Sequence, residues 1–369
     1  PHQSSAASDV YKRQVLGLIF EKINGYQDGS FFTPSFITMY MCRETLRRSV
    51  VQKFNVAKKW NCQTLEDVAD KIETRQDRNE ANKIVNSITI CDPAVGSGHF
   101  LVSALNELIA IKSELKILQD ENGRRLNYYN VEVVNDELVV TDEEGDFFRY
   151  KPKNKERLRV QKTLFHEKQN IIENCLFGVD ININSVKICR LRLWIELLKN
   201  AYYKNKYELE TLPNIDINIK CGNSLISRFA LDADVSKALQ KSKWTIATYQ
   251  NAVLAYHKET NSNAKQGLLR LIDDIKNSFS TSIARNSKEI NELNRLRNEH
   301  YNKYVGGSMF GKEKLTKAAQ KKQDRERVRV EQKIRTLEAA IKDMKTNKIY
   351  DHAFEWRFEF PEVLNEKGD

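Results

Sequence analysis

Two aspartates and a glycine-rich loop are the residues of this chain best suited to holding a small polar molecule. Asp92 begins the run DPAVGSGHF, whose Gly96 and Gly98 let the backbone approach a ligand closely. Asp180 ends a second apolar run, Cys175–Asp180, and an acid in that position can accept both hydroxyls of a ribose. The chemistry indicated is cofactor binding through carboxylates and loop amides.

Local sequence predicts the elements that would position these groups. Ile88–Cys91 is a short apolar, β-branched run typical of a buried strand, and Pro93 ends it. Apolar residues then recur at helical spacing from Phe100 to Leu108. The succession of strand, loop and helix places the acidic loop at the carboxyl edge of an open α/β sheet.

Other ligand loops fit less well. A dinucleotide fingerprint needs glycine where Leu101 stands, and a phosphate loop needs a lysine that is absent here. An ordinary glycine turn remains an alternative. Asp180 follows Gly98 by 82 residues instead of about 20. An inserted β-hairpin over residues 121–155 accounts for part of that excess, and a helix-cap role for Asp180 stays open.

Two further segments are candidates for the same site. Thr33 is a suitable N-cap and Pro34 a suitable first residue for a helix reaching about Phe54, whose free amides could receive a carboxylate. The alternative is that Phe31 and Phe32 fill the core. A third strand is expected at Asp216–Ile219. It precedes Asn223, which is either a hydrogen-bond acceptor for a ligand or part of an Asn-Ser turn.

Together these segments resemble the S-adenosylmethionine-dependent DNA methyltransferases that methylate amino groups. DPAVGSGHF resembles their motif I, SFFTP motif X and GVDI motif II. From Leu16 to Asp369 the order of segments, with GNSLI and FEWRFEFPEVL, resembles the methyltransferase region of type IIG restriction–modification enzymes, which are gamma-class adenine-N6 methyltransferases. The resemblance implies an S-adenosyl-L-methionine site and double-stranded DNA as partner. The implied cofactor-binding residues are Phe32, Thr33, Asp92, Pro93, Ala94, Gly96, Ser97, Gly98, Phe100, Asp180, Ile181 and Asn223.

Within that resemblance, the motif X segment with Phe32 and Thr33 touches the methionine end, Asp180 holds the ribose, and Asn223 accepts from the adenine amino group. Asn223 stands where the family commonly has an aspartate. Its neutral side-chain carbonyl should bind the adenine amino group less tightly than a carboxylate does. The family's catalytic motif, Asn/Asp-Pro-Pro-Tyr/Phe, has no counterpart, because the six prolines are all separate. No catalytic residue is therefore assigned. No metal ligand is assigned either, because the histidines and cysteines show no ligand spacing.

We therefore expect a cofactor-binding fragment that is inactive alone and lacks a C-terminal half with the catalytic motif and the target-recognition domain. Two alternatives stay open. One is a methyltransferase fragment acting on RNA or protein, and the other is a non-enzymatic, basic, helical nucleic-acid-binding protein.

The expected fold class is α/β, a partial class I (Rossmann-like) methyltransferase sheet with a β-hairpin insertion and a long antiparallel helical arm. Residues 1–14 resemble a non-native leader. Residues 15–228 form the expected core, with one helix over Leu65–Asn86 and strands within 121–155. Residues 229–348 form a coiled-coil-like insertion of two long helices with a break at Val305–Ser308, and 349–369 return to the core.

Composition is compatible with a polyanionic partner. The formal net charge is +10 and the isoelectric point is about 9.1. Residues 312–348 contain 13 Lys/Arg against six Asp/Glu, which is either a solvated helix face or an arm that rests on DNA phosphates. The six scattered cysteines and the lack of an apolar run of about 18 residues predict a soluble protein of a reducing cytoplasm with no membrane contact. The resemblance to restriction–modification enzymes implies that this cytoplasm is prokaryotic.

Overall fold

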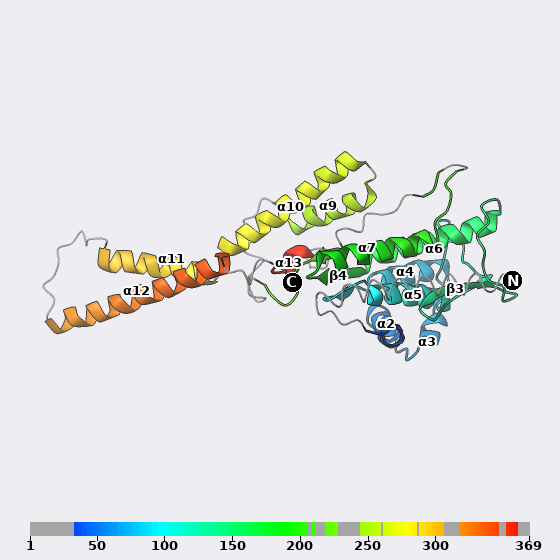
Figure 1. The fold of residues 1–369 in the computed structure, drawn as a ribbon. Coiled ribbons are helices and arrows are strands. Elements are labelled where there is room, and N and C mark those ends of the chain that lie inside the picture. Colours follow the sequence, from blue (N-terminus) through cyan, green and yellow to red (C-terminus); the bar gives the residue numbers. More distant parts are fainter. Residues whose placement is uncertain are drawn as a thin grey trace. The chain divides into compact units, whose positions relative to one another are not determined.

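A computed structural model of the chain describes residues 33–205, 208–210, 218–227, 244–259, 261–285, 288–305, 317–346 and 352–360 (Figure 1). The expected leader, 1–14, and Phe32 lie outside these residues. The chain divides into two compact units, Pro1–Cys221 and Gly222–Asp369, which are described separately below.

A parallel three-stranded sheet forms the centre of the first unit. The order is β1-β4-β5, where β1 is Ile90–Asp92, β4 is Leu176–Asp180 and β5 is Ile219–Cys221. In register, Asp92 lies opposite Gly178, and Asp180 lies opposite Cys221. The carboxyl ends of all three strands therefore meet at one edge of the sheet. The predicted mixed α/β class with a small parallel sheet is confirmed.

Helices cover the central strand β4, whose residues Leu176–Val179 are all buried. The helices α5 (His99–Glu114), α6 (Lys155–Asn174) and α7 (Ile183–Leu198) all contact β4. Every residue of α5 from Leu101 to Lys112 is buried, and α2 (Ser35–Lys58) packs along it. This burial fixes the helix that follows the glycine loop.

Helix starts differ from expectation at two places. Leu65–Asn86 is not one helix but α3 (Leu65–Ala69) and α4 (Arg75–Asn86), because Thr74 and Asp77 form a capping box that starts a new helix. Likewise Thr33 does not cap α2. Pro34 occupies the N-cap position with no side-chain hydrogen bond, and its carbonyl oxygen accepts from the amide of Ile37 at 2.9 Å.

An antiparallel pair of strands lies between α5 and α6. It consists of β2 (Tyr129–Val134) and β3 (Glu137–Asp142), joined by a two-residue turn in which Asn135 and Asp136 have φ values of 51° and 64°. Asn and Asp tolerate this left-handed backbone better than other non-glycine residues. The expected strand at Phe147–Tyr150 is reduced to one bridge between Thr141 and Phe147.

In the described part of the second unit, helices predominate. They are α9 (Ile246–Lys258), α10 (Ser262–Arg285), α11 (Lys288–His300) with the π-helical turn η1 (Tyr301–Val305), α12 (Lys317–Thr346) and α13 (Trp356–Glu359). α11 and α12 lie side by side (Figure 1) on either side of the expected break. α9 is a helix that the sequence analysis did not expect, and it packs on α10. The two helices are separate because the side chain of Asn261 accepts from the amides of Asn263 and Ala264 and so caps the start of α10.

Candidate functional site

The site predicted from the sequence begins where β1 ends. Asp92 Oδ1 accepts a hydrogen bond from the amide of Ala94 at 3.0 Å, which turns the chain out of the strand. Asp180, at the end of the neighbouring strand, accepts from the amide of Gly96 through Oδ2 and from the amide of Asn182 through Oδ1, both at 2.8 Å. The parallel pairing of β1 and β4 thus brings the acidic loop and the second acid together.

Close packing fixes the shape of the glycine loop. The amide of Val95 donates to the carbonyl of Val179 at 2.9 Å, so the loop is attached to β4. Gly98 has a φ of 82° and forms the N-cap position of α5. A Cβ atom at this position would lie 2.6 Å from Cys189 Sγ on α7, well inside contact distance. Glycine is therefore required here by both backbone conformation and space.

Two nearby carboxylates make this edge of the sheet electronegative. Burial raises the pKa of the Asp92 carboxyl, the charge on Asp180 adds to the rise, and the hydrogen bond from the Ala94 amide opposes it. Cys91, the middle residue of β1, and Cys221, the last residue of β5, are both exposed. Partial desolvation of the sulfur and then the charge of Asp92 raise the pKa of the Cys91 thiol to about 11. This arrangement favours ligands that carry cations or hydroxyl donors.

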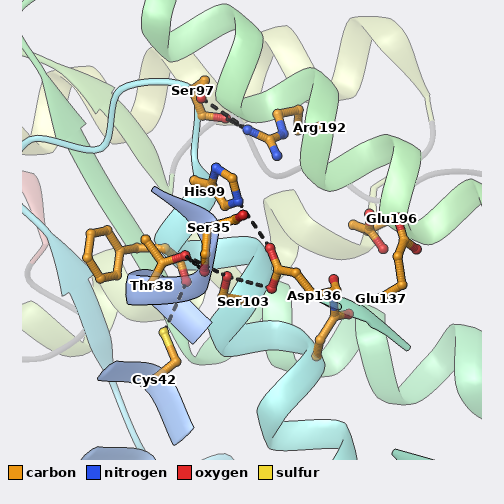
Figure 2. Close-up of polar contacts among 12 residues, drawn as sticks. Ser35, Thr38, Cys42, Ser97, His99, Ser103, Asp136, Glu137, Arg192 and Glu196 are labelled. Carbon is orange, nitrogen blue, oxygen red and sulfur yellow. Dashed lines mark hydrogen bonds and ion pairs between the residues drawn. The ribbon is translucent and has the colours of Figure 1, made fainter. Parts of the chain in front are cut away.

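The remaining residues of the predicted motif divide into exposed and buried groups. Pro93, Ala94 and Ile181 are exposed beside the two acids. Ser97 is buried and points at α7, where Arg192 Nη1 lies 3.0 Å from Ser97 Oγ (Figure 2). Phe100 is partly buried and packs on the core. Ser97 and Phe100 thus support the loop from the protein side.

The tip of the β2–β3 pair reaches the first turns of α5, a contact that the sequence analysis missed. Asp136 Oδ1 accepts from Ser103 Oγ at 2.7 Å, and its Oδ2 lies 3.1 Å from His99 Nε2 (Figure 2). The carbonyl of Asp136 accepts from Asn106 Nδ2 at 2.8 Å. The Asn135-Asp136 turn was recognisable in the sequence, but nothing local signals its partners 30 to 37 residues away.

The helix that follows Thr33 also lies along α5. Thr38 Oγ1 is 3.4 Å from Ser103 Oγ, and Cys42 Sγ contacts the carbonyl of Phe100 at 3.7 Å. The first two turns of α2 are thus held against the first turns of the helix that follows the glycine loop. Thr33, two residues before α2, is half-buried.

Asn223 belongs to the second unit. Its amide donates to the carbonyl of His352 at 2.6 Å, and its side-chain Oδ1 accepts from the amide of Leu225 at 3.1 Å. The second contact is that of the Asn-Ser turn considered as the alternative. A carbonyl oxygen has two lone pairs, so Oδ1 retains acceptor capacity for a ligand.

A polar cavity of about 560 Å³ lies elsewhere in the first unit, beside the residues that precede β1 and β4. Four of the charged residues that line it form ion pairs with one another: Arg159 pairs with Asp120 at 3.2 Å, and Lys162 pairs with Glu121 at 2.9 Å. None of the residues predicted to bind a cofactor lines it.

Two searches of the described residues complete the description. Among them, no cluster of three or more His, Cys, Asp or Glu side chains is arranged to bind a metal ion. No helix in the same part of the chain is both long and apolar enough to span a bilayer.

Comparison with known proteins gives a family match over most of the chain. Residues 68–336 match the family model described as the MmeI DNA-methyltransferase domain. A Methanocaldococcus jannaschii protein, RM.MjaORFECS2P, whose name describes a type II restriction enzyme and methyltransferase, is 31% identical over 230 residues, which are 58% of this chain and 16% of that protein. The adenine-specific methyltransferase PglX of Lacticaseibacillus casei is 24% identical over 200 residues, 50% of this chain and 12% of PglX.

The chain thus spans about a sixth of the length of the first of these relatives and about an eighth of the second. No solved structure matches the chain.

Proposed function

Because this chain belongs to the family of the MmeI DNA-methyltransferase domain, we propose that it is the cofactor-binding part of an adenine-specific DNA methyltransferase of a restriction–modification system. The cofactor is S-adenosyl-L-methionine and the substrate is double-stranded DNA. The observation that carries the proposal is the 2.8 Å hydrogen bond from the Gly96 amide to Asp180 Oδ2, which unites the two acidic strand ends in one site.

The residues at this edge of the sheet fit that cofactor. S-adenosyl-L-methionine supplies a methyl group bound to a sulfonium, and it carries an ammonium group, a ribose diol and an adenine. Asp180 uses one lone pair of each oxygen on the loop amides, which leaves acceptor capacity for ribose hydroxyls. Asp92 and Asp180 together attract the positively charged molecule. Exposed Pro93, Ala94 and Ile181 offer apolar surface beside it.

The other predicted residues complete the proposed site. Thr33 with Phe32 would receive the methionine carboxylate near α2. The role of Asn223 as an acceptor for the cofactor's adenine amino group rests on the family resemblance alone. Gly96, Ser97 and Gly98 shape the loop, and Phe100 anchors the helix behind it. The wider fold that we propose is a Rossmann-like methyltransferase sheet in which β2 and β3 are an insertion and the helices of the second unit form an arm.

We further propose that this chain alone binds the cofactor without transferring its methyl group. Its 369 residues contain no Pro-Pro pair, and the motif that grips a flipped adenine requires one. We therefore propose that its residues bind and orient the methyl donor and that none of them grips the flipped target adenine of DNA.

Isothermal titration calorimetry of the full chain tests the proposal. We expect saturable binding of S-adenosyl-L-methionine and no comparable binding of NAD or ATP. A folded chain that binds none of the three, or that binds NAD or ATP at least as tightly, would overturn the assignment. Tritium transfer from the labelled cofactor is then measured with duplex DNA, RNA and protein extract. Transfer to any of them would contradict the proposal that the chain alone is inactive.

A further inference from the structure

The charges of α12 are sorted by sign around its circumference. Three of its glutamates face α11 and η1, and their partners run in antiparallel order. The pairs are Lys303–Glu326 at 3.0 Å, His300–Glu331 at 3.1 Å and Arg297–Glu338 at 2.6 Å. Exposed pairs of this kind contribute little to stability, so their main effect is to fix the register of the two helices.

An apolar seam lies between these ion pairs. On α12, four aliphatic residues that repeat every three to four positions are half-buried: Val330, Ile334, Leu337 and Ile341. On α11, Leu293 and Leu296 are 7% and 5% exposed. The side of α12 that carries its aliphatic residues is therefore the side that packs on α11.

The opposite side of α12 is basic. It carries Lys321, Lys322, Arg325, Arg329 and Arg335, all exposed, and none of them has an ion-pair partner among the residues that the structure describes. At 100° per residue these five positions fall within an arc of about 140–160° centred away from the seam. They are called here the basic face of α12.

Two charges border this face. Lys333 lies about 20° beyond Lys322, at the edge of the arc. Its charge lowers the pKa of the Glu292 carboxyl of α11, after the larger effect of the Arg295 hydrogen bond. Asp324 is exposed at the edge of the arc. The face is therefore positive along its length, with one acid at its margin.

A helix face that is merely solvated usually mixes both signs. Here three acids are placed at the seam, so the outward cations stay uncompensated. Lys321, Arg325 and Arg329 follow one another at i, i+4 spacing, and like charges at that spacing destabilise a helix. A bound polyanion would remove this repulsion.

We propose that the basic face of α12 binds the phosphate backbone of duplex DNA without reading its sequence. Lys321 to Arg335 spans about 21 Å at 1.5 Å per residue, which corresponds to about six base pairs at 3.4 Å each. Lysine and arginine contacts to phosphates supply affinity and orientation but no base recognition. This surface lies in the second unit and needs no cofactor, so the inference goes beyond the proposed function.

The experiment measures binding of the full chain to a fluorescent duplex of random sequence as salt is varied. The wild-type chain is expected to show a steep loss of affinity with salt. A variant carrying K321Q, K322Q, R325Q and R329Q should reduce the slope of log K against log salt by about three to four. Glutamine preserves helix propensity, and the changes leave the ion pairs with α11 intact.

A matched variant, K59Q, K83Q, K151Q and K153Q, removes four exposed lysines of the first unit and serves as control. Its slope should stay near that of the wild type. An equal loss in both variants, an unchanged slope in the α12 variant, or a wild-type slope near zero would overturn the proposal. So would tighter binding of duplex RNA or of an acidic protein such as polyglutamate, because either would assign the face to another partner.

Discussion

The backbone amide of Gly96 lies 2.8 Å from Oδ2 of Asp180, 84 residues further along the chain. The same carboxylate accepts from the amide of Asn182, so one side chain holds the glycine loop and the start of the segment before α7. A residue first considered as a ribose ligand is thereby also a structural link between two strand ends.

Replacing Asp180 should weaken cofactor binding. In Asp180→Ala the two amides lose a charged acceptor, and hydrogen bonds to charged groups are worth about 1.5–3 kcal/mol each. We expect the dissociation constant for S-adenosyl-L-methionine to rise by about tenfold to a hundredfold in calorimetry. Asp142→Ala, which removes a carboxylate that accepts from the Asp146 amide in an exposed turn, is the control and should bind normally. If the wild-type chain, Asp180→Ala and Asp142→Ala bound S-adenosyl-L-methionine equally tightly, Asp180 would have no part in the cofactor site.

Replacing Gly98 should destabilise the first unit. Gly98→Ala places a Cβ 2.6 Å from Cys189 Sγ on a backbone with a φ of 82°. We expect the free energy of unfolding to fall by about 2–4 kcal/mol, from backbone strain and overpacking together. Gly145 has a φ of 84° and open space around it, so Gly145→Ala should cost only the strain, about 1–2 kcal/mol.

Urea denaturation measures both effects. The double variant Gly98→Ala, Cys189→Ala removes the clashing sulfur and should recover part of the difference. If Gly98→Ala lowered the free energy of unfolding no more than Gly145→Ala does, the close contact with α7 would not contribute to the requirement for glycine at position 98.

Asp92→Asn should stabilise the fold while weakening the site. The pKa of Asp92 is raised by burial and then by Asp180, so the folded chain holds its proton more tightly than the unfolded chain, whose aspartates titrate near 3.8. The contribution of the Asp92 carboxyl to the free energy of unfolding is therefore fully present at acid pH and is lost as the pH rises through the raised pKa of the folded chain. Asparagine removes that loss and can still accept from the Ala94 amide.

We expect Asp92→Asn to raise the free energy of unfolding at pH 7, an advantage that vanishes at pH values below the ordinary aspartate pKa of 3.8. The same variant should bind S-adenosyl-L-methionine less tightly, because one negative charge is gone. Denaturation at pH 7 and at acid pH, together with calorimetry, measures both changes. Lower stability at neutral pH would contradict the stated direction.

Asp136→Ala should loosen the first turns of α5. Ser103 and His99 lose their shared acceptor in a partly buried position, at an expected cost of about 1–3 kcal/mol in unfolding free energy. Asn135 has the same left-handed backbone in the same turn, so Asn135→Ala reports the backbone contribution alone. A cost no greater in Asp136→Ala than in Asn135→Ala would show that the side-chain contacts are unimportant.

Much of the fold around the site follows from local sequence. Apolar runs located β1 and β4 to within two residues, and the glycines after Asp92 located the loop, because buried strands and tight turns leave strong local patterns. The resemblance to restriction–modification methyltransferases is confirmed by the family match over residues 68–336. The roles of the individual site residues remain predictions.

Contacts distant in sequence could not be anticipated in the same way. Neither the pairing of Asp136 with Ser103 nor that of Arg192 with Ser97 has a local signature, because tertiary packing brings the partners together. The predicted helix boundaries were wrong for another reason. Thr74 and Asn261 start new helices by side-chain capping, without the glycine or proline that marks an obvious break.

The two exposed cysteines at the carboxyl edge of the sheet have a practical consequence. Cys91 precedes Asp92, and Cys221 lies opposite Asp180 in the register of β4 and β5. Partial desolvation of the sulfur, and then the charge of the neighbouring aspartate, raise the pKa of both thiols, that of Cys91 to about 11. Alkylating reagents attack the thiolate, so we expect iodoacetamide to label this edge faster at alkaline pH than at neutral pH.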